Sequence, residues 1–366
     1  MHLGELAEDS AAVPARWRAV EIAGLAADSR EVAPGYLFAA LAGSHEDGSR
    51  FIPDARRRGA VAVLAGPDIK TAPDLPLITC DNPRRALALM AARFYGPQPD
   101  VAVAVTGTNG KTSVASFLRQ IWLEAGLNAA SLGTVGLATR KGETPLTHTT
   151  PAPVVLPRLL RALSREGITH VAMEASSHGL AQYRMDGVRL KAAGFTNISR
   201  DHLDYHSGFE DYFRQKLRLF SELLPAGAAA VVNADCEHAG TVIEAARARG
   251  LDVMTVGERG RALRLASHVR VPLGQELAIE LEGGGRHELL LPLVGDFQAS
   301  NALVAAGLAI AAGLDAKMAL GALARLEGAR GRLEKAGETQ GGGAIFIDYA
   351  HTPDALETVL RTLRPY

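Results

Sequence analysis

One short segment restricts the fold of this chain more than any other. Residues 102–118 read AVAVTGTNGKTSVASFL, where an apolar run ends in Gly, Thr and Asn and a helical pattern follows. This order predicts a buried strand, a loop that holds phosphate, and a helix whose N-terminus faces the same anion. The helix has an apolar face that repeats every three or four residues, formed by Val114, Phe117, Leu118, Ile121 and Trp122.

The loop has the residue types that phosphate binding requires. Its glycines allow backbone N–H groups to turn toward an anion, its lysine supplies positive charge, and the hydroxyl of Thr112 can bind Mg²⁺. A strict phosphate loop has Gly where this chain has Val105. The alternative is a glycine-rich turn with a surface lysine, but the flanking strand and helix favour phosphate binding. The expected nucleotide contacts are Gly107, Thr108, Asn109, Gly110, Lys111, Thr112 and Ser113.

The rest of the chain predicts an α/β protein of two or three domains. Its 366 residues exceed one ordinary domain. From residue 101, short apolar strands alternate with helical patterns, which favours a parallel sheet with helices on both faces. Residues 263–295 alternate apolar and polar positions, which predicts antiparallel hairpins that turn at 283–285. We predict domains at 1–96 and 97–328, and the start of a third, truncated one at 329–366 whose strand and helix have no core of their own.

Composition excludes several classes of protein. The net charge of −1 offers no basic excess for nucleic acid. The longest apolar stretch, at 301–314, is too short to span a membrane, and the first ten residues lack the pattern of a signal peptide. Only Cys80 and Cys236 are present, and no Cys/His spacing suits zinc. We therefore expect a cytoplasmic protein in a reducing compartment.

Three further residues are candidates for chemistry. Glu174 ends the apolar run THVAMEAS, and a carboxylate at the carboxyl end of a parallel strand can hold a metal near a triphosphate. The alternative is a glutamate that only caps the sheet edge. His202 also follows a strand end, but neighbouring Asp and His side chains leave the ligand undecided. Lys216 lies in an aromatic-rich helix, where the pattern alone favours a lysine whose head reaches water.

Several motifs together resemble the Mur ligase family. They are TGTNGKT (106–112), HTTP (148–151), MEASSHGL (173–180), NISRDHLDYH (197–206), FQASNALVAAG (297–307), GRLE (331–334) and DYAHTPDAL (348–356), in the order of that family. The last is similar to the members that add a diamino acid to UDP-N-acetylmuramoyl-L-alanyl-D-glutamate. Residues 28–55 resemble the family's uridine-binding N-terminal domain, and the C-terminal part would begin a Rossmann-like domain.

The resemblance implies an ATP-dependent amide ligase of peptidoglycan synthesis that works through an acyl phosphate. It places Mg²⁺ on Thr112, Glu174, His202 and Lys216, with Lys216 as a carbamate formed from CO₂. It gives catalytic roles to Lys111, Lys216 and His202. Further ATP contacts would be Asn301, Arg332 and Asp348. The contacts with uridine and diphosphate would be Ser29, Ser44, His45 and Glu46. The contacts with the muramoyl dipeptide would be Thr149, Thr150, Ser176, Gln182 and Arg184.

Two departures from the family pattern affect these expectations. Residues 44–46 read Ser-His-Glu where many relatives have His-Gln and a small residue. The family's DNPR motif, which is associated with meso-2,6-diaminopimelate, belongs to the C-terminal domain, whereas DNPR occurs here at 81–84, where helix-capping chemistry accounts for it. We expect residues 1–366 to bind the UDP-muramoyl dipeptide as a monomer and to form little amide product.

Other functions stay open at this stage. They are a lysine-adding ligase, another Mur or folylpolyglutamate-type ligase, a simple phosphate-loop ATPase or kinase, and a fragment that binds the nucleotide sugar without catalysis.

Overall fold

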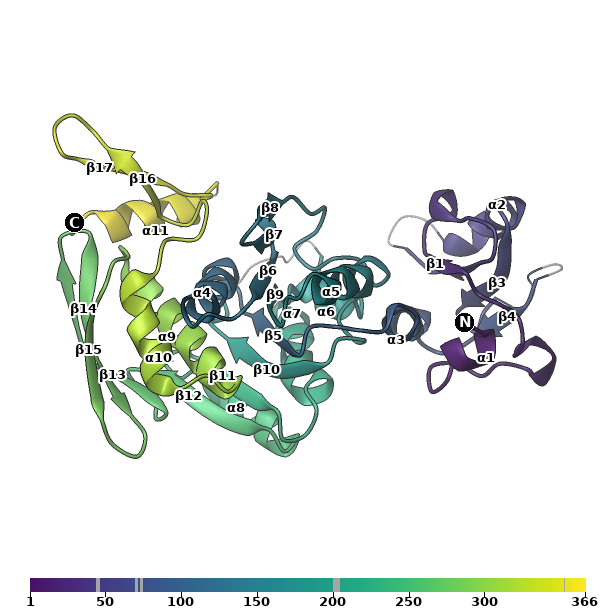
Figure 1. Ribbon diagram of the computed structural model, residues 1–366, viewed down its shortest axis with the longest axis horizontal. Helices are drawn as coiled ribbons and strands as arrows, with labels where there is room; N and C mark the ends of the chain where they lie inside the picture. Colours follow the sequence, from purple (N-terminus) through teal and green to yellow (C-terminus); the bar gives the residue numbers. More distant parts are fainter. Residues whose placement is uncertain (44–46, 70–71, 73–74, 200–204, 352) are drawn as a thin grey trace. The chain divides into compact units, whose positions relative to one another are not determined.

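The computed structural model describes residues 1–43, 47–69, 72, 75–199, 205–351 and 353–366. Its chain forms two compact units (Figure 1). The first unit comprises Met1–Gln98, Pro151–Glu166 and Ala181–Arg189, and the second comprises Pro99–Thr150, Gly167–Leu180 and Leu190–Tyr366. The three-domain division made from the sequence stays a prediction.

The first unit is built on a four-stranded parallel sheet. The strands lie in the order β1 (Gly24–Ala26), β2 (Tyr36–Ala40), β3 (Ala60–Ala65) and β4 (Leu77–Thr79). Its helices are α1 (Leu3–Leu6), α2 (Ile52–Arg57), α3 (Pro83–Tyr95) and α5 (Val155–Arg165). The side chain of Asn82 accepts a hydrogen bond from the Arg85 amide at 3.0 Å, and Pro83 is the first helical residue. The DNPR segment is therefore a helix start, as predicted.

The second unit contains an 11-stranded sheet in the order β15-β14-β13-β12-β11-β10-β5-β9-β6-β7-β8. Strands β6, β9, β5, β10, β11 and β12 pair in parallel, which confirms the predicted parallel sheet. Their bounds are β5 (Val101–Thr106), β6 (Ala129–Gly133), β9 (His170–Glu174), β10 (Leu190–Phe195), β11 (Ala229–Asn233) and β12 (Asp252–Gly257).

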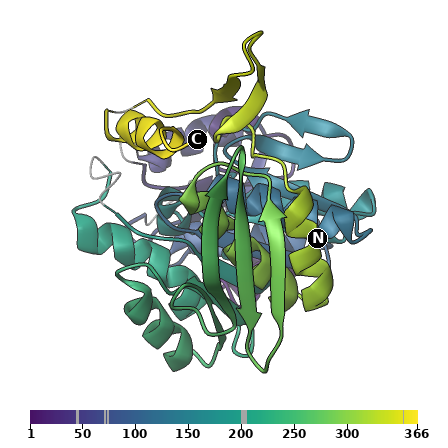
Figure 2. The same cartoon turned by 90° about the vertical axis from the view of Figure 1, so that its left-hand side faces the viewer.

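Both edges of this sheet are antiparallel. The predicted hairpins form β13 (Leu263–Val271), β14 (Gly274–Leu281) and β15 (Arg286–Leu291), which stand at the front of Figure 2. The other edge is a meander of β6 with β7 (Gly136–Thr139) and β8 (Gly142–Thr144), which the sequence did not predict. Strand β8 is exposed and β7 is half-buried, and both are only three or four residues long, so they carry little hydrophobic pattern.

Helices cover both faces of the parallel strands. A β-carbon on Gly194 of β10 would lie 2.8 Å from Leu308, whereas the next residue, Phe195, packs its ring against Phe213. Because successive strand residues point to opposite faces, the helices that carry Leu308 and Phe213 lie on opposite sides. One side has α4 (Lys111–Glu124), α9 (Asp296–Ala311) and α10 (Ala316–Ala322). Further helices of the unit are α6 (Ser177–Ala181), α7 (Phe209–Arg218) and α8 (Ala239–Ala248).

The C-terminal segment is thinly packed, as expected. Strands β16 (Glu334–Glu338) and β17 (Ala344–Ile347) form a separate antiparallel pair, followed by α11 (Pro353–Leu363). Large apolar side chains here stay exposed, with Leu360 at 67% and Tyr349 at 61%.

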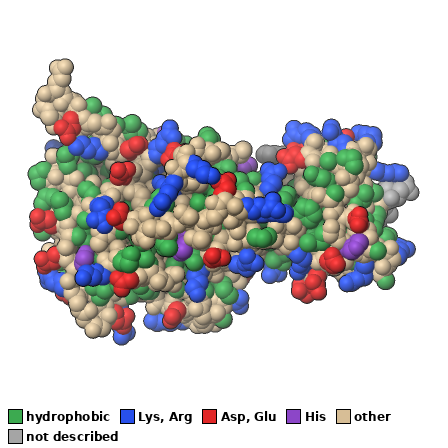
Figure 3. Space-filling model, viewed as in Figure 1, with side chains coloured by type: hydrophobic (Ala, Val, Ile, Leu, Met, Phe, Trp, Pro, Cys, Tyr) green, Lys and Arg blue, Asp and Glu red, His purple; other side chains and the backbone are tan. Residues whose placement is uncertain are grey.

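The surface carries charges of both signs. On the face in Figure 3, basic and acidic side chains are interspersed over the second unit. Within the described part of the chain, no helix has the length and apolar character needed to cross a bilayer.

Candidate functional site

The predicted phosphate loop connects β5 to α4 in the second unit. Gly107 and Gly110 have φ values of +146° and +86°, which other residues rarely adopt. A β-carbon on Gly107 would lie 1.9 Å from the hydroxyl oxygen of Thr196, and one on Gly110 would lie 2.3 Å from Oδ1 of Asn301. The loop backbone is therefore packed directly against its neighbours, and both positions require glycine.

The end of β10 fixes the shape of the loop. The hydroxyl of Thr196 donates to the Asn109 carbonyl at 2.6 Å, and the Asn109 amide donates to Oδ1 of Asn197 at 3.0 Å. The hydroxyl of Thr108 lies 3.0 Å from that of Tyr212 on α7. These contacts hold the loop open around the N-terminus of α4, where the positive end of the helix dipole favours an anion.

Two lysine ammonium groups converge on the loop. Nζ of Lys111 donates to the carbonyls of Gly107 and Thr108 at 2.9 and 2.7 Å. Nζ of Lys216 donates to the same Gly107 carbonyl at 2.7 Å and lies 4.5 Å from the centre of the Tyr212 ring. Lys216 is 1% exposed, so the interpretation in which its head reaches water is wrong.

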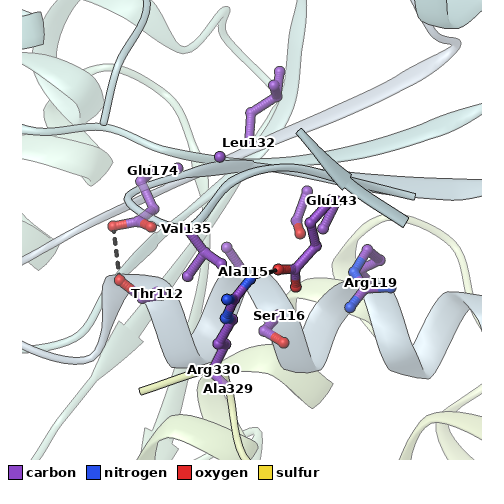
Figure 4. A pocket seen from close by; sticks show the side chains of 14 residues that line it. Thr112, Ala115, Ser116, Arg119, Leu132, Val135, Glu143, Glu174, Ala329 and Arg330 are labelled. Atoms are coloured by element: carbon purple, nitrogen blue, oxygen red, sulfur yellow. Dashed lines mark hydrogen bonds and ion pairs between the residues drawn. The ribbon is translucent and has the colours of Figure 1, made fainter. Parts of the chain in front are cut away.

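Glu174, at the end of β9, is buried beside the loop (Figure 4). The hydroxyl of Thr112 donates to Oε2 of Glu174 at 3.1 Å. Thr134 donates to the same carboxylate twice, from its amide to Oε1 at 2.7 Å and from its hydroxyl to Oε2 at 3.2 Å. A β-carbon on Gly133 would lie 2.0 Å from Oε1 of Glu174. The carboxylate therefore occupies space that the side chain of any residue other than glycine at position 133 would fill.

This donor set fits Mg²⁺, which prefers carboxylate and hydroxyl oxygens. In the described ranges no group of three or more His, Cys, Asp or Glu side chains forms a ready-made metal site. That finding does not conflict with the predicted ligands, since Glu174 is the one carboxylate among them. His202 lies outside the described residues.

Residues predicted to hold the muramoyl peptide lie next to Glu174. The hydroxyl of Thr150 donates to the Glu174 carbonyl at 2.8 Å and lies 3.0 Å from the hydroxyl of Ser176. The hydroxyl of Thr149 lies 3.1 Å from that of Thr134. The phosphate loop, the carboxylate and these hydroxyls therefore meet at the carboxyl ends of the parallel strands.

The remaining predicted ATP contacts are linked to the loop through buried amides. Nδ2 of Asn301 donates to Gln298 at 3.1 Å, and Nε2 of Gln298 donates to the carbonyl of Arg332 at 3.2 Å. Asp348 accepts from the Leu333 amide at 2.8 Å. The segment that carries Arg332 and Asp348 is thus tied to the helix that carries Asn301.

Among the residues that the structure describes, three predicted substrate contacts belong to the first unit: Ser29, Gln182 and Arg184. Ser29 is buried at the start of a short helical turn after β1. Arg184 donates to Oε1 of Gln182 at 3.2 and 2.7 Å. Ser44, His45 and Glu46 lie outside the described residues.

Sequence reasoning missed three residues of the site: Thr134, Tyr212 and Gln298. Thr134 had an available signal, because it directly follows β6, which is a parallel neighbour of β9. Tyr212 reaches Thr108 and Gln298 reaches Arg332, and these partners are distant in the sequence, so no local pattern reveals the two contacts.

A small cavity of about 30 Å³ lies behind Thr112 and Glu174. In it Glu143 and Arg330 form an ion pair at 2.7 Å (Figure 4). Burial lowers the pKa of the nearby Arg119 guanidinium, while Glu143 and Glu327 partly oppose that shift. The pair joins the β8 edge to the segment that follows α10.

The fold and the site together define a phosphate-loop nucleotide-binding protein, with its site at the carboxyl ends of parallel strands. Comparison with known proteins narrows this class. The family model described as the Mur ligase middle domain matches residues 105–309, and that of the Mur ligase family catalytic domain matches residues 21–95. The chain belongs to the Mur ligase family.

Its relatives include two enzymes named UDP-N-acetylmuramoyl-L-alanyl-D-glutamate–2,6-diaminopimelate ligase. The one from Bradyrhizobium diazoefficiens is 52% identical over 373 residues, which cover 100% of this chain and 76% of the relative. The one from Brucella melitensis is 50% identical, with 100% and 75% covered. A solved structure of a ligase with the same name is 30% identical with a TM-score of 0.87, and the match covers 100% of this chain and 74% of that one.

Proposed function

We propose that this chain is an ATP-dependent ligase of peptidoglycan synthesis that joins a diamino acid, 2,6-diaminopimelate, to UDP-N-acetylmuramoyl-L-alanyl-D-glutamate. The names of relatives at about half identity support the reaction and its substrates. One structural observation carries the proposal: Thr112 of the phosphate loop touches Glu174, whose backbone touches Thr150. A triphosphate and a carboxylate substrate can therefore meet at the carboxyl ends of the parallel strands.

The chemistry begins with activation of a carboxylate. An oxygen of the D-glutamyl carboxylate attacks the γ-phosphorus of ATP, the bond from phosphorus to the bridging oxygen breaks, and ADP leaves with that electron pair. The amine of the diamino acid then adds to the acyl phosphate carbonyl. The tetrahedral intermediate expels inorganic phosphate, and the amine proton passes to a base.

The chain's own residues supply position and charge for these steps. Lys111 and the N-terminus of α4 neutralise charge on the phosphates, which is the main contribution that an enzyme makes to phosphoryl transfer. Asn301 contacts the loop from α9, while Arg332 and Asp348 approach from the C-terminal segment. The muramoyl dipeptide is held by Thr149, Thr150, Ser176, Gln182 and Arg184, and the uridine diphosphate part is held by Ser29.

Mur ligases use ATP and Mg²⁺, and the metal offsets phosphate charge when bound. In this chain Thr112 and Glu174 would hold one Mg²⁺, and we assign His202 and Lys216 to a second. We further propose that Lys216 is carbamylated. The ammonium group first loses a proton to solvent. The lone pair of the neutral amine then attacks the carbon of CO₂, a C–N bond forms as one C=O π pair moves to oxygen, and the nitrogen loses a second proton to solvent, so that the side chain becomes an anion. What supports this proposal is the burial of Lys216 and its 2.7 Å contact with the loop.

Replacement of Lys216 tests the carbamate. Lys216→Ala should lose more than 90% of acyl-phosphate formation, and added acetate or formate should restore part of it by supplying a carboxylate in the same space. Lys216→Arg is the matched control, since it keeps a cation that cannot form the carbamate. Full activity in either variant would contradict the assignment.

We place the reaction in the cytoplasm, where ATP and UDP-linked precursors are available, and we propose that the chain works as a monomer. Ultracentrifugation of residues 1–366 with and without Mg·ATP checks the oligomeric state. A stable dimer in both conditions would contradict it.

The function is tested with binding and product measurements. Calorimetry of residues 1–366 should show binding of UDP-N-acetylmuramoyl-L-alanyl-D-glutamate, and UDP-N-acetylglucosamine serves as the control ligand. Protein expressed from the complete gene should convert the dipeptide, ATP and meso-2,6-diaminopimelate into the amide, ADP and phosphate. Faster use of lysine would assign the lysine-adding alternative, and ATP hydrolysis without amide product would contradict the proposal.

A further inference from the structure

Thr134 is an exposed residue in the turn after β6. Nevertheless it makes the two hydrogen bonds to Glu174 described above, one to each carboxylate oxygen. Thr112 adds a third. Hydrogen bonds have preferred directions, and here both oxygens of the Glu174 carboxylate accept one from Thr134. The two bonds together fix the plane of the carboxylate before any ligand binds.

The direction of the hydrogen bonds carries further information. The hydroxyl of Thr134 has one proton, and it donates that proton to Glu174. The hydroxyl of Thr149, 3.1 Å away, must therefore be the donor to Thr134. With its own proton used, Thr149 presents only lone pairs on its free side, where it can accept from an N–H or O–H group but cannot donate.

We propose that Thr134 is a positioning residue that links two parts of the site. It orients the Glu174 carboxylate for the metal. Through Thr149 it also directs hydroxyl lone pairs toward N–H or O–H groups of the muramoyl-peptide substrate. The inference rests on the proposed function, because the metal and the peptide are those of the ligase reaction. Gly133 supports it, since a β-carbon there would push the carboxylate away from Thr134.

Three substitutions separate this role from a structural one. Thr134→Val keeps the branched shape and the backbone amide but removes the hydroxyl, and Thr134→Ser restores the hydroxyl. Thr149→Val breaks only the link to the peptide. Thr144→Val, on the neighbouring exposed strand β8, is the matched control for a Thr to Val change away from the site.

Metal binding is measured directly, by electron paramagnetic resonance of Mn²⁺ added to residues 1–366 with a non-hydrolysable ATP analogue. Substrate binding is measured by calorimetry with the UDP-muramoyl dipeptide. Thr134→Val should weaken both by about 10- to 100-fold, the usual effect of losing a residue that orients a metal ligand. Thr149→Val should weaken only the dipeptide, and Thr134→Ser and Thr144→Val should match the unaltered chain, with melting temperatures unchanged throughout.

The outcomes distinguish this inference from the function itself. Equal Mn²⁺ and dipeptide affinities in Thr134→Val and the unaltered chain would overturn the positioning role alone. Thr134→Val could instead lower the melting temperature and weaken the binding of Mn²⁺, of the dipeptide and of nucleotide without metal. That result would also overturn the positioning role, because it would show a structural one. If the unaltered chain bound neither Mn²⁺ with nucleotide nor the dipeptide, the proposed function would fail instead.

Discussion

Replacing Gly107 by alanine is the sharpest test of the loop. Two separate costs apply. The backbone at φ +146° is strained for a residue with a side chain, which costs about 1–3 kcal/mol. The added β-carbon would lie 1.9 Å from the Thr196 hydroxyl and 2.9 Å from the Asn197 carbonyl, and such overpacking costs about 1–3 kcal/mol. Together they predict a loss of about 2–6 kcal/mol in the free energy of unfolding.

Gly126 is the matched control at the other end of α4. It also has a positive φ, +81°, but a β-carbon there would meet nothing within 4 Å. Gly126→Ala should therefore show the backbone cost alone, about 1–2 kcal/mol. Because the two backbone costs overlap, a larger loss in Gly107→Ala reports mainly the contacts around the loop.

Urea unfolding reads these changes through Trp122, which is fully buried on α4. The chain has two tryptophans, so a Trp17→Phe background leaves Trp122 as the single reporter. The double variant Gly107→Ala/Thr196→Ala should recover part of the steric cost, as expected for residues in direct contact. The reasoning is refuted if Gly107→Ala loses no more stability than Gly126→Ala, or if the double variant shows no coupling.

Three shorter predictions concern other contacts. Lys111→Ala should weaken binding of Mg·ATP by about 1.5–3 kcal/mol, the usual worth of a charged hydrogen bond; equal affinity in calorimetry would contradict the loop assignment. Asn82→Ala removes the cap of α3 and should cost about 1 kcal/mol in urea unfolding, and a neutral result would contradict the cap. Hydrogen bonds from Arg214 and Gln215 lower the pKa of Asp211 from 3.8 to about 2, so its stabilising effect should be complete above pH 3.8 and disappear as the pH falls through 2; an NMR titration with a midpoint near 3.8 would disprove this.

The sequence predicted those parts of the site that local patterns encode. The strand, loop and helix at 102–118 follow from apolar periodicity and two glycines, and the place of Glu174 follows from the rule that parallel strands end at one edge. The buried head of Lys216 could not be predicted this way. Its carbonyl partner, Gly107, lies 109 residues away, and helical periodicity shows which face is covered but not what covers it.

Short exposed elements were also beyond prediction. Strands β7 and β8 have few buried side chains, so backbone pairing with their neighbours defines them. Thr134 makes its hydrogen bonds from such an exposed turn, where a threonine has no hydrophobic pattern. Its partner Thr149 lies on the bend that follows the meander.

The packing of α9 on α4 has a consequence for synthesis on the ribosome. The apolar side of α4, with Phe117, Leu118 and Trp122, shares one core cluster with α9. Helix α4 ends at Glu124, whereas α9 ends at Ala311, 187 residues later. At a synthesis rate of about 5–20 residues per second, α9 is completed about 10–40 s after α4. During that interval the apolar side of the helix that will bind phosphate at its N-terminus stays without the helix that covers it in the folded protein.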